Sequence, residues 1–470
     1  MSTTNRDRKV QQRFAAAVAV WVVILLLGLF CVWWGFFGAG TEPSPTPPAP
    51  TPTTAGALVP LGAPTTPAQT PGNTPQPQPT TENEGTQATI APTPSEPATE
   101  ATEAPTSPPH PPVPPPSEEV FGYGIAADAL PLPEYTANQV KSLGLGWIKQ
   151  QVQWGDFERN PGQMDWSGYD AVIEAANKEG LHVMLSVVGA PMWSRSYIDS
   201  NPEGAPPDDL ALFADFLGRL VDRYKGRVHA IEIWNEENLD REWDTAEGVN
   251  PARYVEMLRL AYQAVKSRDP NIIVISGALS PVGATATDPN NPSRIIYMND
   301  RQYFQEMVNL GFLSYADCVG VHHNGYNIPP HVRWNDPYRD DTAVFRGFWD
   351  NPDISWSFRS TLEWYNEAVS GMKPLCVTEF GWASAEGLGG APPGFEFALD
   401  NTLEEQAEYD VEAFQLMREW GFVRLAFLWN LNYANTGPRT PDDPNAPYSL
   451  IDYIGAPRPA FFAIQQMEKP

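Results

Sequence analysis

Two acidic residues stand among polar and aromatic side chains at positions where buried strands are expected to end. Glu236 lies in the run Trp-Asn-Glu-Glu-Asn, and Glu379 lies in the run Thr-Glu-Phe-Gly-Trp. Cleavage of an acetal needs two carboxyl groups, because one protonates the leaving oxygen while the other acts at the anomeric carbon. Aromatic faces stack on the C–H surfaces of sugars, and amides or imidazoles pair with hydroxyl groups. The two clusters therefore predict chemistry on a carbohydrate.

A scaffold that gathers strand ends is predicted by an alternation that begins at Val120. Short apolar runs are expected as strands at 120–125, 146–152, 181–188, 228–234, 271–276, 317–322, 374–380 and 424–431. Amphipathic runs are expected as helices at 134–143, 167–179, 206–224, 251–268, 301–310, 358–370, 403–420 and 458–467. Eight strand–helix units of the α/β class predict a single (β/α)8 TIM barrel, which carries its chemistry at the carboxyl ends of the strands. A doubly wound sheet is the alternative, but no glycine-rich phosphate turn follows the first strand.

The start of the chain predicts a membrane anchor. Residues 1–13 are polar and basic, and residues 14–38 run without a charge for long enough to cross an apolar bilayer core of roughly 30 Å. Because Lys and Arg precede this segment, we expect an uncleaved signal-anchor helix with residues 1–13 in the cytoplasm. A cleaved signal peptide is the alternative, although its apolar stretch usually spans about 7–15 residues. The expected location is the cell membrane, crossed once, with the catalytic domain outside the cytoplasm.

Residues 39–117 are expected to be a disordered linker. They hold 24 of the 50 prolines and lack Lys, Arg, Phe, Trp and Tyr, so they cannot bury enough apolar surface to fold. The barrel domain is then expected at 118–470, and it carries −24 of the formal net charge of −27. An acidic domain excludes nucleic acid and strongly anionic polymers as ordinary partners. A neutral or weakly charged glycan remains open.

Several polar and sulfur-bearing residues have simpler expected roles. Glu232 lies inside the fourth expected strand and should meet a basic partner within the barrel, for which Lys149 is the candidate. Cys318 and Cys376 lie within strands, and without a basic neighbour in sequence they are expected to be small buried apolar residues. The acids that follow Glu236 are expected to form a hydrated loop; these are Glu237, Asp240, Glu242 and Asp244.

Taken in order, these motifs resemble the retaining glycoside hydrolases of clan A. The Trp-Asn-Glu run at 234–236 and the Thr-Glu-Phe-Gly-Trp run at 378–382 are most similar to the cellulase-like, family 5-like and family 39-like barrels. The likeness covers residues 118–470. It implies that Glu236 is the acid/base and Glu379 the nucleophile, and that no metal or organic cofactor is required. Glu236 is then expected to be protonated at rest and Glu379 to be ionised.

The resemblance also implies a set of substrate-binding residues. Asn235 would hydrogen-bond the 2-hydroxyl group, while His322 and Tyr326 would orient Glu379 and the sugar. Trp429 would form the floor of the cleavage subsite. The other expected substrate-binding residues are Trp154, Trp193, Trp382 and Lys149.

The predicted function is that of a membrane-anchored extracytoplasmic O-glycosyl hydrolase, acting as a monomeric barrel on β-glycosidic bonds of a poly- or oligosaccharide with retention. A catalytically silent carbohydrate-binding barrel is one alternative, and a transglycosylase that uses the same two Glu is another. The glycine-rich loop at 384–397 is expected to border the cleft, with Phe395 or Phe397 able to contact sugar. An ordinary surface excursion is the alternative for this loop.

Overall fold

The computed structural model describes residues 113–117, 120–197 and 204–469. The predicted cytoplasmic tail, the predicted anchor at 14–38 and the linker up to residue 112 lie outside these ranges. In the described part of the chain, no helix has the length and apolar character that a membrane crossing requires.

Eight parallel strands form the barrel that the alternation predicts. They are β1 (Gly122–Ala126), β2 (Trp147–Gln153), β3 (His182–Val188), β4 (Ala230–Ile233), β5 (Ile273–Ser276), β8 (Val319–Gly325), β9 (Leu375–Trp382) and β10 (Val423–Leu428). Their hydrogen-bonded order is β5-β4-β3-β2-β1-β10-β9-β8, with every pair parallel. A parallel bridge between Ile275 and Cys318 joins the two edges and closes the ring.

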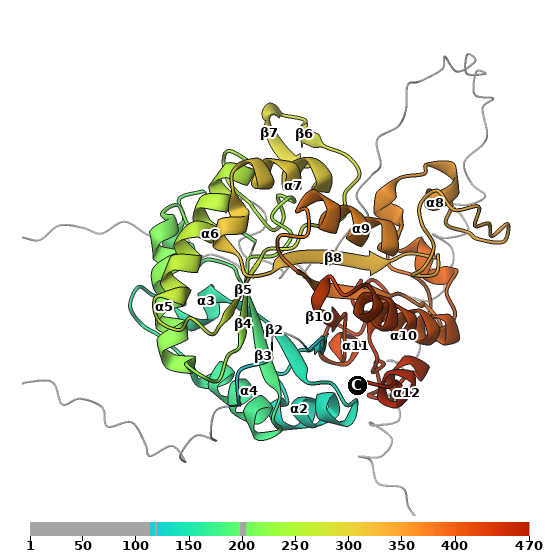
Figure 1. Ribbon diagram of the computed structural model, residues 1–470, viewed down its shortest axis with the longest axis horizontal. Helices are drawn as coiled ribbons and strands as arrows, with labels where there is room; N and C mark the ends of the chain where they lie inside the picture. Colours follow the sequence, from blue (N-terminus) through green and yellow to red (C-terminus); the bar gives the residue numbers. More distant parts are fainter. Residues whose placement is uncertain (1–112, 118–119, 198–203, 470) are drawn as a thin grey trace, which may run out of the picture. The chain divides into compact units, whose positions relative to one another are not determined.

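Helices surround this sheet (Figure 1). The eight that follow or precede strands are α2 (Pro133–Ser142), α4 (Ser167–Lys178), α5 (Leu210–Tyr224), α6 (Pro251–Lys266), α7 (Asp300–Asn309), α9 (Phe358–Ala368), α10 (Leu403–Trp420) and α12 (Pro459–Gln466). Local signals set their ends: Asn250 caps α6 ahead of Pro251, and Thr402 forms a capping box with Glu405 at the start of α10. Each predicted helix is confirmed to within a few residues.

A hairpin of two strands was not predicted from the sequence. After β5 the chain forms an antiparallel hairpin of β6 (Ala286–Asp288) and β7 (Asn291–Tyr297), which projects from the helical ring (Figure 1). Its strands are exposed or half-buried except at Arg294, so they lack the run of buried apolar residues that marks the barrel strands.

Cys318 and Cys376 are buried, as predicted, but the sequence analysis did not predict that they are paired. They form a disulfide between the start of β8 and the start of β9, with their Cα atoms 5.8 Å apart. The reason is register: Val319 pairs with Leu375 on the neighbouring strand, and both cysteine side chains face the barrel interior beside Trp147. Sequence spacing does not reveal this pairing, because it depends on which strands become neighbours.

The disulfide generates a stability prediction. It closes a separation of 58 residues, so replacing both cysteines by Ala should lower the free energy of unfolding by about 4 kcal/mol through loop entropy. Denaturant unfolding with and without reductant measures this. Reductant should destabilise the wild-type chain and leave the double variant unchanged. Two reactive thiols at these positions in the unreduced, denatured protein would contradict the pairing.

The last residues of the expected linker contact the amino-terminal face of the barrel. The Nε2 atom of His182 lies 2.9 Å from the carbonyl oxygen of Pro114, and Nε2 of His229 lies 3.2 Å from that of Val113. His229 accepts a hydrogen bond from the Val183 amide at Nδ1, so its Nε2–H donates. Burial lowers the pKa of His229 to about 4, which keeps the ring neutral. The chain therefore enters the barrel from the face opposite the expected catalytic strand ends.

Candidate active site

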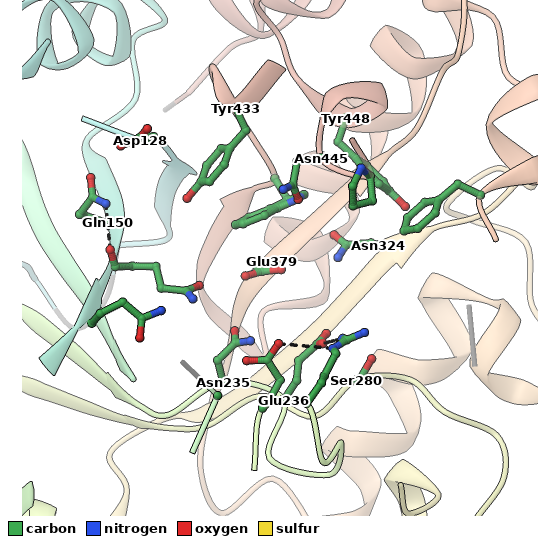
Figure 2. Close-up of a pocket in the computed structure, with 18 of the residues that line it drawn as sticks. Asp128, Gln150, Asn235, Glu236, Ser280, Asn324, Glu379, Tyr433, Asn445 and Tyr448 are labelled. Carbon is green, nitrogen blue, oxygen red and sulfur yellow. Dashed lines mark hydrogen bonds and ion pairs between the residues drawn. The ribbon is translucent and has the colours of Figure 1, made fainter. Parts of the chain in front are cut away.

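The carboxyl-terminal strand ends surround a cavity of about 460 Å³. Figure 2 shows Glu379 in its middle, with Asn235 and Glu236 on one side and Tyr433, Asn445 and Tyr448 on the other. A cavity of this size accommodates a small ligand, and its lining mixes carboxyl, amide and aromatic groups. Its contributors include Asp128 after β1, Gln151 on β2, Ser280 after β5, Asn324 on β8 and Trp429 after β10.

The chain leaves β4 through a backbone that few residues adopt. Trp234 and Glu236 have φ angles of 78° and 45°, both in the left-handed region that is costly for bulky side chains. Hydrogen bonds hold this turn in place: the Trp234 ring Nε1 donates to the carbonyl oxygen of Glu242 at 2.7 Å, and the Glu236 amide donates to that of Ala278 at 2.9 Å. The turn buries the Trp234 ring and directs the Glu236 side chain into the cavity.

The buried ammonium group of Lys149 links Glu232 on β4 to Glu379 on β9. The Lys149 ammonium group on β2 lies 3.0 Å from Glu379 Oε1 and 3.3 Å from Glu232 Oε2. Burial alone would lower the pKa of Lys149, but the two carboxylates raise it above its ordinary value, so the side chain stays charged. The predicted pairing of Glu232 with Lys149 is confirmed, and Lys149 also provides Glu379 with a fixed positive partner.

His322 lies between the two candidate catalytic residues. Its Nδ1 atom is 3.4 Å from Glu236 Oε1, and its Nε2 atom is 3.7 Å from Glu379 Oε1. Burial would lower the pKa of His322, yet the charge of Glu379 and the hydrogen bond to Glu236 raise it. One imidazole therefore contacts both carboxyl groups, which places them in a common site as the resemblance implies.

Glu236 departs from the expected resting state. Its other oxygen, Oε2, accepts a hydrogen bond from Nη2 of Arg241 at 2.5 Å. Burial would raise the pKa of Glu236, but His322 and Arg241 together lower it to about 2. The expectation that Glu236 is protonated at rest is thus corrected, because the contacts with Arg241 and His322 favour the ionised form of the substrate-free carboxylate.

Three predicted substrate-binding residues lie outside the cavity. Trp154 is buried and stacks on Phe216, while its Nε1 donates to Glu158. Trp193 donates to the carbonyl oxygen of Glu158, and Trp382 is buried and donates to that of Ile328. Their rings fill the layer between sheet and helices, where large apolar surface is best buried, so the structure gives them packing roles.

The remaining predicted residues are brought together. Asn235, Tyr326 and Trp429 line the cavity beside the two Glu, and His322 and Lys149 contact Glu379, which lines it as well. The peptide bond that follows Trp429 is cis. The loop at 384–397 also borders the cavity through Phe395 and Phe397, so its predicted position is confirmed.

Other cavity residues carry no strong signal in the sequence. Asp128, Arg241, Ser280, Asn445 and Tyr448 come from connections between strands and helices, where polar residues are ordinary. The expected hydrated acidic loop is also corrected. Glu237 is fully buried, and Asp244 is buried against Arg294, whose Nη2 lies 2.9 Å from its Oδ1. Arg294 lies on the unpredicted hairpin, so its partner could not be inferred from the sequence.

Residues 129–307 match the sequence model of the cellulase family, glycosyl hydrolase family 5. This part of the barrel is similar to that family. This match supports the enzyme class that the motifs predict, that of an O-glycosyl hydrolase, and the resemblance to clan A glycoside hydrolases is confirmed. No curated protein is significantly similar in sequence to the chain.

Solved structures share the fold of this barrel. A family 39 glycoside hydrolase from the gut symbiont Bacteroides cellulosilyticus WH2 is 18% identical with a TM-score of 0.52, over 74% of this chain and 63% of that one. The chain thus spans less than two thirds of that enzyme's length. A GH5_18 protein from Streptomyces cattleya, solved with GlcNAc, is 16% identical with a TM-score of 0.52, over 75% of this chain and 80% of that one. At these identities the likeness shows the fold.

The position of Glu379 makes its replacement informative. Glu379→Gln keeps the side-chain volume and removes the charge, so turnover should fall by several orders of magnitude while the barrel stays folded. Glu367→Gln, on the exposed face of α9, is the matched control and should behave as wild type. Hydrolysis of aryl glycosides and thermal unfolding report the two properties. Unchanged turnover in Glu379→Gln would exclude this residue as the nucleophile.

Proposed function

We propose that the chain is a membrane-anchored, extracytoplasmic retaining glycosidase that cleaves β-glycosidic bonds of a poly- or oligosaccharide. The single observation that carries this proposal is the contact of one imidazole, that of His322, with both Glu236 and Glu379 in a cavity lined by amides and aromatic rings. Two carboxyl groups in one site, one of them paired with a buried ammonium group, suit a double displacement.

The proposed reaction assigns one role to each carboxyl group. Glu379 attacks the anomeric carbon while protonated Glu236 gives its proton to the leaving oxygen, and a glycosyl-enzyme ester forms on Glu379. Glu236 then removes a proton from water, which attacks the ester and releases the sugar with its original configuration. Asn235 lies beside Glu236 and is proposed to bind the 2-hydroxyl group, and Trp429 is proposed to support the ring of the sugar.

A neutral or weakly charged glycan fits the charges of the cavity. Asp128, Asp156 and Glu242 line it besides the two catalytic Glu. Among the described residues that line it, Arg241 is the sole Lys or Arg side chain, and it is ion-paired with Glu236. A polyanionic substrate would meet repulsion on entry.

Stereochemistry tests the proposed mechanism. The first product of hydrolysis should keep the β configuration, which NMR detects before mutarotation. In a crystal structure the carboxyl groups of Glu236 and Glu379 should lie about 5–5.5 Å apart, the separation of retaining enzymes. Product with inverted configuration, or a gap of roughly 6.5–9.5 Å, would point to a single displacement instead. Longer products would favour the transglycosylase, and binding without turnover would favour the silent barrel.

Two features support an extracytoplasmic location. Disulfides persist in oxidising compartments, and Cys318 and Cys376 are paired. Residues 113–117 contact the amino-terminal face of the barrel, so a tether there leaves the cavity at the opposite face accessible. Together with the basic residues that precede the apolar segment at 14–38, these features favour a cytoplasmic amino terminus.

This topology predicts the outcome of proteolysis on intact cells. Protease should cut within residues 39–112, which precede the contacts at His182 and His229, and should release an intact barrel. The released fragment is identified by mass and by activity. Full protection of the barrel, with any outer barrier made permeable, would reverse the proposed orientation.

A further inference from the structure

Both oxygens of Glu236 are occupied in the substrate-free site. Oε1 contacts Nδ1 of His322 at 3.4 Å, and Oε2 accepts from Nη2 of Arg241 at 2.5 Å. A general acid must present a proton on one carboxyl oxygen to the leaving oxygen of the substrate. Glu236 therefore cannot act as an acid while both contacts stand.

Arg241 is the contact that can be released. The His322 side chain is fully buried and fixed on β8, whereas Arg241 lies on the loop after β4 with its side chain 26% exposed. The backbone on either side is held, because Arg294 binds both Asp240 and Asp244. Movement is thus confined to the Arg241 side chain.

A second carboxyl group is in place to receive the guanidinium group. Oε1 of Glu242 lies 3.4 Å from Nε of Arg241, and Glu242 lines the same cavity. Arg241 therefore bridges Glu236 and Glu242 in the substrate-free site, and a small rotation of its side chain would release Glu236 while the cation stays paired with Glu242. A cation held either by both carboxylates or by Glu242 alone is a two-state element of the kind that ligand binding can bias.

We propose that Arg241 is a positioning residue that releases Glu236 and stays paired with Glu242 when a glycan enters the cavity, so that the proton of Glu242 passes to Glu236. The inference rests on the proposed role of Glu236 as the acid/base. It assigns Glu242 as the proton store of the site.

The protons of this exchange balance. Burial and the charge of Glu236 raise the pKa of Glu242 to about 7 against the opposing effect of Arg241, so below that pH Glu242 holds a proton. In this step Glu242 loses that proton and keeps its contact with the guanidinium group, while Glu236 gains the proton and loses its contact with the guanidinium group. No net charge enters or leaves the site. The other titratable groups that face Glu236 or Glu242 are His322, Tyr326, Glu379, Tyr448 and Glu237.

The pH dependence of kcat/KM tests the role of Arg241. Its alkaline limb reports loss of the proton that Glu236 needs. Arg241→Gln removes a cation that favours ionised Glu236, so the limb should move to higher pH by about 1–3 units. Arg241→Lys keeps the charge, so its alkaline limb should move less than that of Arg241→Gln. Arg259→Gln, whose partner Glu256 is on the surface of α6, is the matched control and should leave the profile unchanged.

Glu242→Gln should act in the opposite direction. Without the proton store and the second partner, Arg241 stays on Glu236, so kcat/KM near neutral pH should fall at least tenfold on glycans with poor leaving groups. The dinitrophenolate group of a dinitrophenyl glycoside leaves without being protonated. On these substrates the fall in kcat/KM should therefore disappear. A merely structural role would reduce activity on both kinds of substrate alike.

Several results would overturn the inference while leaving the proposed function intact. These are an unmoved alkaline limb in Arg241→Gln, or an equal loss on both leaving groups in Glu242→Gln. If Arg241→Gln does not fold, a crystal structure of Glu379→Gln with bound glycan decides, since Arg241 should then contact Glu242. Arg241 still on Glu236 in that complex would overturn the inference. Absence of turnover by the wild type on all glycans would instead reject the proposed function, and this inference with it.

Discussion

The buried ammonium group of Lys149 is the interaction on which the centre of the barrel depends. It lies between Glu232 and Glu379 and also donates to the carbonyl oxygen of Thr378 at 3.2 Å, so it joins β2, β4 and β9 across the interior. Removing one member of a buried ion pair typically costs about 3–5 kcal/mol, because the partner is left charged without compensation. Here the same contact that stabilises the barrel positions the proposed nucleophile, so stability and chemistry are coupled at Lys149.

From this cation outward, carboxyl groups alternate with basic side chains across the site. The order is Glu232, Lys149, Glu379, His322, Glu236 and Arg241. Each carboxylate is thereby compensated in a setting that water reaches poorly. The arrangement has a consequence for catalysis, since the contacts that stabilise ionised Glu236 oppose its function as an acid. Productive binding of substrate must therefore break one contact of Glu236. Arg241 is the partner that lies on a loop, so its contact is the one that can be broken.

The sequence predicted the parts of this molecule that depend on local pattern. The eight strands follow from apolar runs, and Glu236 and Glu379 follow from motifs at strand ends. The pairing of Glu232 with Lys149 followed from the rule that a buried acid needs a cation. The features that the sequence did not reveal depend on contacts between distant residues. The disulfide requires β8 to lie beside β9, and nothing in the sequence distinguishes Arg241 from other polar loop residues. Trp154 and Trp382 were misassigned because a ring after a strand can turn either into the cavity or towards the helices.

The two faces of the barrel have different roles, as is general for this fold: one contributes stability and the other carries the site. On the amino-terminal side, the disulfide and the rings of Trp147, His182 and His229 form a packed base to which residues 113–117 attach. On the carboxyl-terminal side, Trp234 and Glu236 adopt costly backbone angles around a cavity of polar groups. Strain of this kind persists where the surroundings over-determine the backbone, and it costs of order 1–3 kcal/mol per residue. The disulfide-linked base stabilises the other end of the same strands and offsets that cost. The residues of the catalytic face can therefore keep backbone angles that are unfavourable for them.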